Sequence, residues 1–229
     1  MSETGHFSDM TSNKSIWLAT LGVALLCAGP AVAQQQFQVS VYGGYQGASH
    51  SGVTTTDGDS FTAGWEGKPF QFPTYYGARG TWWLDDVGLP NTGLSIDFAH
   101  VKVYADDETL AESGYSVLEF TDGLNVLTVN ALYKFWPESA FRPYVGAGVG
   151  ITIPHVEVTR GPDETFEYQY GGPAIQAQFG VEYRFNESWS AFAEYKGNYS
   201  MVDVAIDHGE RLKTNLVTHA VNVGVSYHF

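Results

Sequence analysis

The sequence has only one cysteine and few basic residues. Cys27 has no partner within the chain, so neither an internal disulfide nor a cysteine-based metal site can form. Only 11 Lys and Arg residues accompany 25 Asp and Glu residues, which gives a formal net charge of -14. This balance excludes nucleic acid as a partner, because phosphate binding needs a basic surface. The carboxylates can instead bind divalent cations.

Long apolar runs are missing as well. The longest, residues 16–27, is about a dozen residues, short of the roughly 20 that a membrane-spanning helix needs. It follows Lys14 and precedes the small residues 31–33, which is the arrangement of a secretory signal peptide. We therefore expect residues 1–33 to be cleaved after export, leaving a mature domain of residues 34–229 that contains no cysteine.

Motifs of soluble enzymes are also absent from the sequence. There is no G-x-S-x-G, no Walker loop and no H-E-x-x-H. The glycine-rich stretch GAGVG at 146–150 is not followed by a helical pattern, so it does not indicate a dinucleotide site. No flavin or nicotinamide motif is present. Any catalytic activity must therefore depend on residues outside these motifs.

What recurs along the chain is alternation of apolar with small or polar residues. In residues 218–229, Val221 and Val223 share one face, and Asn222 and Gly224 share the other. Segments of about 9–11 alternating residues are typical of strands that cross a membrane. Eight such segments are present, at residues 37–46, 75–83, 92–103, 125–136, 143–155, 174–185, 189–199 and 218–229.

The connections between these segments alternate in length. Those after the second, fourth and sixth segments are short, and the others are longer, polar and acidic. This predicts an all-β fold, an eight-stranded antiparallel transmembrane β-barrel with short periplasmic turns and longer extracellular loops, integral to a bacterial outer membrane. The terminal Phe229 resembles the signal read by the outer-membrane insertion machinery, which is therefore an expected partner.

Charged residues fall on the inward face of several predicted strands. The interior of an eight-stranded barrel is just wide enough to be filled by side chains. Buried charges are costly unless they are paired, so we predict structural ion pairs that fill the lumen; a conducting pore or an internal active site is the alternative. The predicted lumen residues are Arg79, Asp97, Lys134, Glu182, Arg184, Glu194 and Lys196.

Three histidines share the phase of the lipid-facing residues near the predicted outer rim. They are His100, His155 and His219, and an acidic run follows the first of them. In one interpretation they belong to the polar-aromatic girdle, and acidic loops bind the cations that bridge lipopolysaccharide phosphates. In the other, imidazole and carboxylates form a metal site or a general base that faces a lipid head group.

The second interpretation names specific residues. The predicted catalytic residues are His100, Asp106, Asp107, Glu108, His155 and His219. The predicted ligands of a divalent metal ion, whose identity the sequence leaves open, are His100, Asp106, Asp107 and Glu108.

Several segments resemble a known family. They are HVKVYADDETL at 100–110, GYSVLEFTDGLNVLTVNALYKFW at 114–136, PYVGAGVGITIPHVEV at 143–158 and TNLVTHAVNVGVSYHF at 214–229. These resemble the lipid A oxidases of rhizobial outer membranes, with YADDETL and LEFTDGLN the most specific pieces. The resemblance implies oxygen-dependent oxidation of the proximal glucosamine of lipid A to an aminogluconate unit, with release of hydrogen peroxide and dependence on divalent cations. It implies no particular catalytic residues.

Two other functions stay open at this point. A non-catalytic barrel of the OmpA or OmpW type, with a structural or adhesive role, fits the same pattern of strands. A lipid A acyl hydrolase or acyltransferase would also meet its substrate, lipopolysaccharide, at the outer rim. The three hypotheses differ in what they do to the mass of lipid A.

Overall fold

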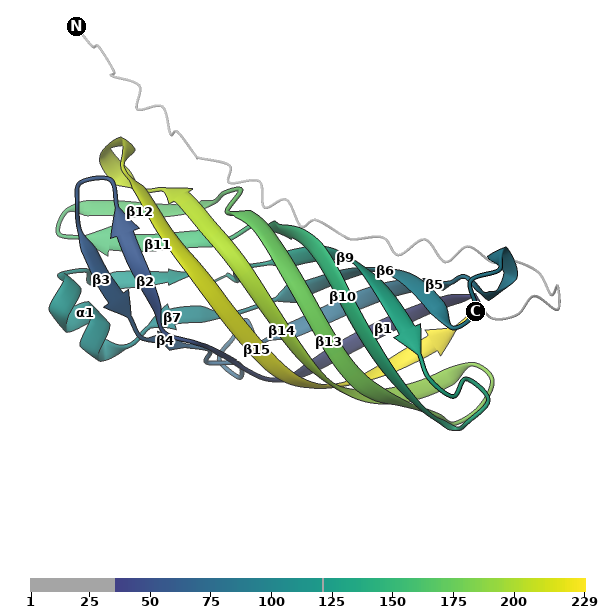
Figure 1. The fold of residues 1–229 in the computed structure, drawn as a ribbon. Coiled ribbons are helices and arrows are strands. Elements are labelled where there is room, and N and C mark those ends of the chain that lie inside the picture. The colour runs from purple at the N-terminus through teal and green to yellow at the C-terminus, as the bar shows by residue number, and fades with distance from the viewer. Residues whose placement is uncertain (1–35, 121) are drawn as a thin grey trace, which may run out of the picture. The chain divides into compact units, whose positions relative to one another are not determined.

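The structure, a computed structural model, describes residues 36–120 and 122–229 (Figure 1). The predicted signal peptide, residues 1–33, lies outside these described residues. Eight strands follow one another around one sheet, each antiparallel to its neighbours. In spatial order they are β1 (Phe37–Ala48), β5 (Tyr76–Trp83), β6 (Thr92–His100), β9 (Val126–Lys134), β10 (Phe141–Thr152), β13 (Gly172–Arg184), β14 (Trp189–Ala205) and β15 (Arg211–His228).

Pairing between the first and the last strand closes this sheet. β1 runs antiparallel to β15, from Gln38 opposite His228 to Ala48 opposite Thr218. Closure leaves neither strand with an unpaired edge, as a sheet in hydrocarbon requires. The connections after β5, β9 and β13 are short, and the first of them contains the 3₁₀ turn η1 (Asp85–Val87). The predicted eight-stranded antiparallel barrel is confirmed.

The alternation seen in the sequence becomes alternation of environment in the barrel wall. Along β15, Val221 and Val223 point outward and are 60% and 65% exposed, whereas Asn222 between them is completely buried inside. β5 and β9 follow the same alternation along their whole length. The barrel therefore presents an apolar outer surface and a polar interior, as expected of a wall that faces lipid.

The extracellular end is more ordered than predicted. β14 and β15 extend well beyond the predicted segments 189–199 and 218–229, and a hairpin of β2 (Ser51–Thr55) and β3 (Ser60–Ala63) pairs with the start of β15. These extensions were missed because their alternation is reversed: Val202, Val204 and Leu212 point inward, whereas Asp203, Arg211 and Lys213 take the outward positions, so the apolar outward series is not repeated. Among the described residues, no helix has the length and apolarity to cross a bilayer.

A second sheet covers this end of the barrel (Figure 1). The short helix α1 (Asp107–Ser113) connects the second and third strands of this sheet. We call it the cap sheet, and its strands in sequence order are β4 (Trp65–Glu66), β7 (Val103–Ala105), β8 (Val117–Phe120), β11 (His155–Arg160) and β12 (Asp163–Tyr168).

Two predicted barrel strands are shorter than expected because the chain breaks away into the cap sheet. The predicted segment 143–155 ends as barrel strand at Thr152, and His155 begins β11 instead. Pro154 between them has no amide hydrogen to donate to a strand ladder. The predicted segment 92–103 likewise ends at His100. Both histidines therefore lie at the junction between the barrel and the cap sheet.

An apolar core fills the space between the cap sheet and the extended barrel strands. Leu118 and Phe120 of the cap sheet and Leu212 and Leu216 of β15 are almost fully buried within it. The Trp65 and Phe120 rings lie 6.3 Å apart in the same cluster. Each such side chain contributes about 1.5–3 kcal/mol on burial, so the cap is a packed structure and not a set of loose loops.

Candidate functional site

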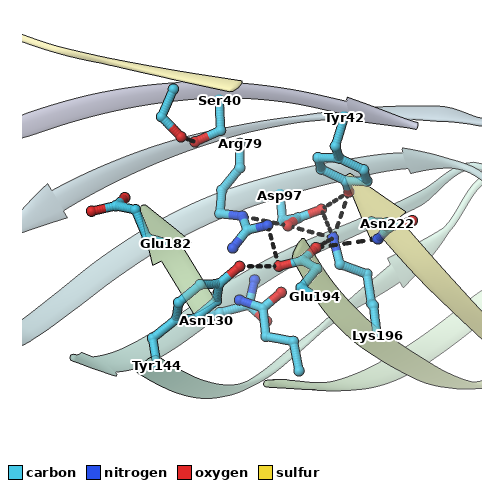
Figure 2. Close-up of polar contacts among 12 residues, drawn as sticks. Ser40, Tyr42, Arg79, Asp97, Asn130, Tyr144, Glu182, Glu194, Lys196 and Asn222 are labelled. Atoms are coloured by element: carbon cyan, nitrogen blue, oxygen red, sulfur yellow. Dashed lines mark hydrogen bonds and ion pairs between the residues drawn. The ribbon is translucent and has the colours of Figure 1, made fainter. Parts of the chain in front are cut away.

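A buried ion-pair network fills the middle of the barrel (Figure 2). Nη2 of Arg79 lies 2.7 Å from Oε2 of Glu194, and its Nε lies 3.0 Å from Oδ2 of Asp97. Nζ of Lys196 lies 2.7 Å from Asp97 and 3.5 Å from Glu194. Two cations thus meet two carboxylates, and these four of the predicted lumen residues do form ion pairs.

Hydroxyl and amide groups complete this network. Tyr42 donates to Asp97, Tyr144 donates to Oε2 of Glu194 over 2.7 Å, and Nδ2 of Asn222 donates to Oε1 of Glu194 over 3.2 Å. On the side toward the short turns, the lumen holds a cavity of only about 20 Å³. That volume admits roughly one water molecule. Side chains therefore close the lumen at this level.

The other three predicted lumen residues differ from one another. Glu182 lies 3.9 Å from Arg142, which forms a long ion pair. Nζ of Lys134 instead lies 3.6 Å above the Trp83 ring, a cation–π contact. Arg184 donates to main-chain oxygens of the turn after β13 and is half-buried. In the described part of the chain, Lys134 and Arg184 are therefore seen against a ring and a turn near the barrel mouth and not in close ion pairs.

His100 is held by a defined hydrogen bond at the end of β6. Its Nδ1 lies 2.9 Å from Oδ1 of Asn125, and its ring stacks on Tyr76 with 5.1 Å between centroids. Nδ2 of Asn125 donates to the main-chain oxygens of Asp122 and Gly123. Because the amide nitrogen is used in this way, the amide oxygen accepts from Nδ1, and Nε2 of the neutral imidazole keeps its lone pair.

A depression in the outer wall, which we call the His100 depression, opens over this imidazole. Its volume is about 450 Å³. His100 is only 5% exposed, and its buried Nε2 has no hydrogen-bond partner. The histidine keeps the predicted outward phase but is covered, which corrects the expectation of an open, lipid-facing ring. The depression is lined by Pro73, Tyr76, Phe98, His100, Asp122, Asn125, Ile153 and Tyr168.

His155 lies beside the same depression. Its main-chain nitrogen donates to the oxygen of Gly123 over 3.0 Å. Its ring packs edge-on against Phe166 and Tyr168, with centroids 4.4 and 4.6 Å away. The structure therefore brings both His155 and His100 close to Gly123. His155 is buried by the β11–β12 hairpin and not exposed to lipid as predicted.

His219 is on a separate part of the wall. It is half-buried on β15, opposite Gly47 of β1 and Gly197 of β14. It lines a groove of about 710 Å³ between these strands and the segment 65–69. The structure thus keeps the outward position predicted for His219 but does not bring it to His100.

The acidic run predicted to bind metal is part of α1 and its cap. Oδ1 of Asp106 accepts from the amide of Thr109 over 2.8 Å, the N-cap interaction of a helix. Hydrogen bonds from Thr109 lower the pKa of the Asp106 carboxyl. Asp107 and Glu108 are exposed in the first helical turn, where their charge suits the helix dipole. These positions explain the residues without a metal ion.

The four predicted metal ligands are not gathered into a site. Among the described residues, the only three His, Cys, Asp or Glu side chains whose ligand atoms lie within 4.8 Å of one another are Asp163, Asp207 and His208. The shared site predicted for His100 with the acidic run is therefore not formed, because that run is ordered as a helix in the cap.

The predicted catalytic and metal-binding sets do not include the polar residues that accompany His100. Asp122 and Asn125 both belong to the LEFTDGLN segment, which carried the family resemblance, so a signal for them was present. Gly123 between them has a φ of +94°, and a Cβ there would overlap Nδ1 of His100. Tyr168 approaches His100 from β12, which is distant from His100 in the sequence. Nothing in the local sequence indicated this contact.

A pair of carboxyl groups in the cap sheet also lies outside the predicted sets. Glu119 of β8 and Glu157 of β11 are directly opposite each other across two antiparallel strands. Burial raises the pKa of Glu119 to about 7, and the like charge of Glu157 adds to the effect. Glu119 is therefore a group that titrates near neutral pH in the cap.

Several solved structures are similar to this chain. The chain resembles neisserial surface protein A at 17% identity, over 84% of this chain and 97% of that one, with a TM-score of 0.49. It resembles the outer membrane protein AlkL at 15% identity, over 88% and 94%, with a TM-score of 0.48. OprG of Pseudomonas aeruginosa matches at 15% identity, over 85% and 94%, with a TM-score of 0.44. No curated protein matches the sequence.

A family match covers most of the chain. Residues 18–229 match the family described as the outer membrane protein beta-barrel domain. The closed eight-stranded barrel and its apolar outer face agree with that assignment. The protein is integral to the outer membrane, and its chain belongs to the outer membrane protein β-barrel domain family.

Proposed function

We propose that this barrel works on its outer wall, where the His100 depression binds the head-group region of lipid A, and that the bound lipid is oxidised there. The observation that supports this most directly is the Nε2 of His100, a buried acceptor without a partner inside a hollow of about 450 Å³. A buried polar atom without a partner is costly unless a ligand or water satisfies it.

The lining of the depression suits an amphiphilic ligand. Tyr76 and Phe98 lie on the barrel strands β5 and β6, and Ile153 follows the end of β10. We expect these three apolar side chains to contact the acyl chains of the lipid. Asp122 and His100 offer a carboxylate and an imidazole to a sugar hydroxyl on the same wall. A sugar with attached acyl chains matches this change from apolar to polar. Lateral access from the lipid also avoids the closed lumen.

The reaction comes from the resemblance to lipid A oxidases. A hemiacetal at C1 of the proximal glucosamine loses two electrons and two protons to give a lactone, and O₂ accepts both to give hydrogen peroxide. Water then opens the lactone to the aminogluconate, so the lipid gains the mass of one oxygen atom. We assign His100 the role of general base, whose Nε2 takes the proton of the C1 hydroxyl.

A metal ion is implied by the same resemblance, but the residues of the depression do not fit one. Its only carboxylate and imidazole are Asp122 and His100, and they belong to no group of three close ligands among the described residues. No step is therefore assigned to a metal there. The route of the electrons to O₂ is assigned to no residue.

A second candidate is favoured by the family match and by the closed lumen. It is a non-catalytic barrel of the OmpA or OmpW type with a structural or adhesive role, for which a packed cap and a sealed interior are sufficient. In both candidates the outer-membrane insertion machinery is the proposed partner that recognises β15, which precedes Phe229.

The experiment is mass spectrometry of lipid A from a Gram-negative host that lacks this modification. Aerobic expression should add one oxygen atom to lipid A, and anaerobic growth should prevent the addition. Unchanged lipid A, with the barrel folded in the outer membrane, would remove the oxidase and leave the non-catalytic barrel. Loss or gain of an acyl chain would indicate a hydrolase or an acyltransferase instead. A chelator added to the aerobic culture tests the implied dependence on divalent cations.

A further inference from the structure

Three potential metal ligands meet at the tips of two extracellular hairpins. Asp163 begins β12, and Asp207 and His208 belong to the 3₁₀ turn η2 (Asp207–Gly209) between β14 and β15. One ligand atom from each lies within 4.8 Å of the others. Nε2 of His208 is 2.8 Å from Oδ1 of Asp163. Residues more than 40 positions apart by numbering thus present an imidazole and two carboxylates to one point.

The hollow beside these residues contains a second feature that points to a ligand. It has a volume of about 310 Å³ and is also lined by Tyr115. Tyr115 is only 3% exposed, and its buried hydroxyl has no hydrogen-bond partner. An unsatisfied buried hydroxyl costs about 1–3 kcal/mol. A metal-bound water in the hollow would give this hydroxyl a partner.

Charge in the hollow favours a cation. Asp57 and Glu210 line it in addition to the two aspartates of the cluster. Arg160, which also lines it, forms ion pairs with Asp57 at 3.3 Å and with Asp59 at 2.5 Å. Those contacts join the β11–β12 hairpin to the β2–β3 hairpin and direct the guanidinium toward that side. The Asp163 and Asp207 carboxylates face His208 and not a fixed cation.

We infer that Asp163, Asp207 and His208 bind a divalent transition-metal ion of the zinc type, which joins the β11–β12 hairpin to the β14–β15 hairpin. Two carboxylates with one imidazole are a common donor set for such ions, and water completes the coordination. The ion stabilises the cap from outside, whereas the apolar core does so from within. The site shares no residue with the His100 depression, so failure of the zinc proposal and failure of the proposed oxidation can be distinguished.

The test is isothermal titration of the full protein in detergent with Zn²⁺ alone. The wild type should bind one ion, and His208→Asn should weaken binding at least about tenfold because a ligand is lost. His208 has a φ of +60°, a conformation that Asn tolerates, so this variant keeps the turn. Asp163→Asn should weaken binding in the same way. His50→Asn changes an exposed histidine outside the hollow and is the matched control.

Limited proteolysis provides a second readout. Zn²⁺ should slow cleavage in the β11–β12 and β14–β15 hairpins of the wild type and of His50→Asn, but not of His208→Asn. The inference is overturned if the wild type binds no zinc at micromolar concentrations. It is equally overturned if His208→Asn binds zinc and is protected as well as His50→Asn is.

Discussion

Oδ1 of Asn125 accepts the hydrogen bond of His100 Nδ1 over 2.9 Å. Since Nδ2 of Asn125 donates to two main-chain oxygens, the amide cannot turn round without losing both bonds. The imidazole is therefore held in one tautomer, and Nε2, which keeps its lone pair, has no hydrogen-bond partner. In the proposed reaction this orientation suits His100 to act as the base, and Asn125 would then be a positioning residue.

Substitution of His100 should impair oxidation of lipid A more strongly than substitution of Asn125. His100→Gln should lower the rate by about 100- to 10,000-fold, the usual contribution of a general base. Asn125→Ala should lower it by about 10- to 100-fold, as loss of an orienting partner does, and should also shift the pH profile of the reaction. Rates are measured as hydrogen peroxide released from purified protein and lipid A.

Glu108→Gln is the informative control for these variants. The sequence marked Glu108 as catalytic, but the structure places it in the first turn of α1, exposed to solvent. We expect the Glu108→Gln variant to oxidise lipid A at the same rate as the wild type. A large loss of activity in Glu108→Gln with normal activity in His100→Gln would reverse the assignment of the site.

Gly123→Ala should displace His100 and destabilise the cap. The φ of +94° is unfavourable for alanine, and the new Cβ would overlap the imidazole Nδ1. Strain of this kind costs about 1–3 kcal/mol. Urea unfolding of the barrel in lipid vesicles measures the loss. Gly80→Ala, at a barrel position where a Cβ meets nothing within 4 Å, should cost much less; equal losses at the two positions would contradict the crowding at His100.

Glu194→Gln should be strongly destabilising. It removes one of the two carboxylates that compensate Arg79 and Lys196 in the closed lumen. A buried charge left without its partner costs about 3–5 kcal/mol. Asp203→Asn breaks an ion pair of 2.7 Å with Arg211 that is exposed to solvent, and should cost less than about 1 kcal/mol. Similar unfolding curves for the two variants would indicate that water enters the lumen at this level.

The stability of the cap should depend on pH through Glu119. Burial raises the pKa of this carboxyl from 4.5 to about 7, so the folded state binds its proton more tightly than the unfolded state. The contribution of protonated Glu119 to the free energy of unfolding is complete below pH 4.5 and is lost as the pH rises through about 7. Glu119→Gln, which cannot ionise, should remove this part of the pH dependence. Unfolding followed at several pH values would contradict the assignment if wild type and variant lost stability in parallel.

The barrel could be predicted from the sequence because lipid imposes a strict constraint. Every second residue of a wall strand must be apolar, and a series such as Val221, Val223 and Val225 satisfies that condition over a whole strand. The ion pairs of Arg79 and Lys196 with Asp97 followed from the same phase, since a charge on the inward face must find a partner.

The cap and the site were predictable only in part. The cap strands are short and receive their burial from one another, so β7 and β8 of three and four residues leave no recognisable period. His100 and His155 were recognised by their outward phase, but their covering by Tyr168 and its hairpin depends on long-range contacts. Asp106 followed by Asp107 and Glu108 has the pattern of a helix N-cap with an acidic first turn, which would have argued against a metal-binding loop.

The most direct measurement compares the lipid A of cells that produce the wild type, His100→Gln or His50→Gln at equal levels in the outer membrane. The account predicts one added oxygen atom for the wild type and for His50→Gln, and unmodified lipid A for His100→Gln. An added oxygen atom in all three samples, or in none of them, would contradict the claim that O₂ oxidises this lipid on the outer wall with His100 as the general base.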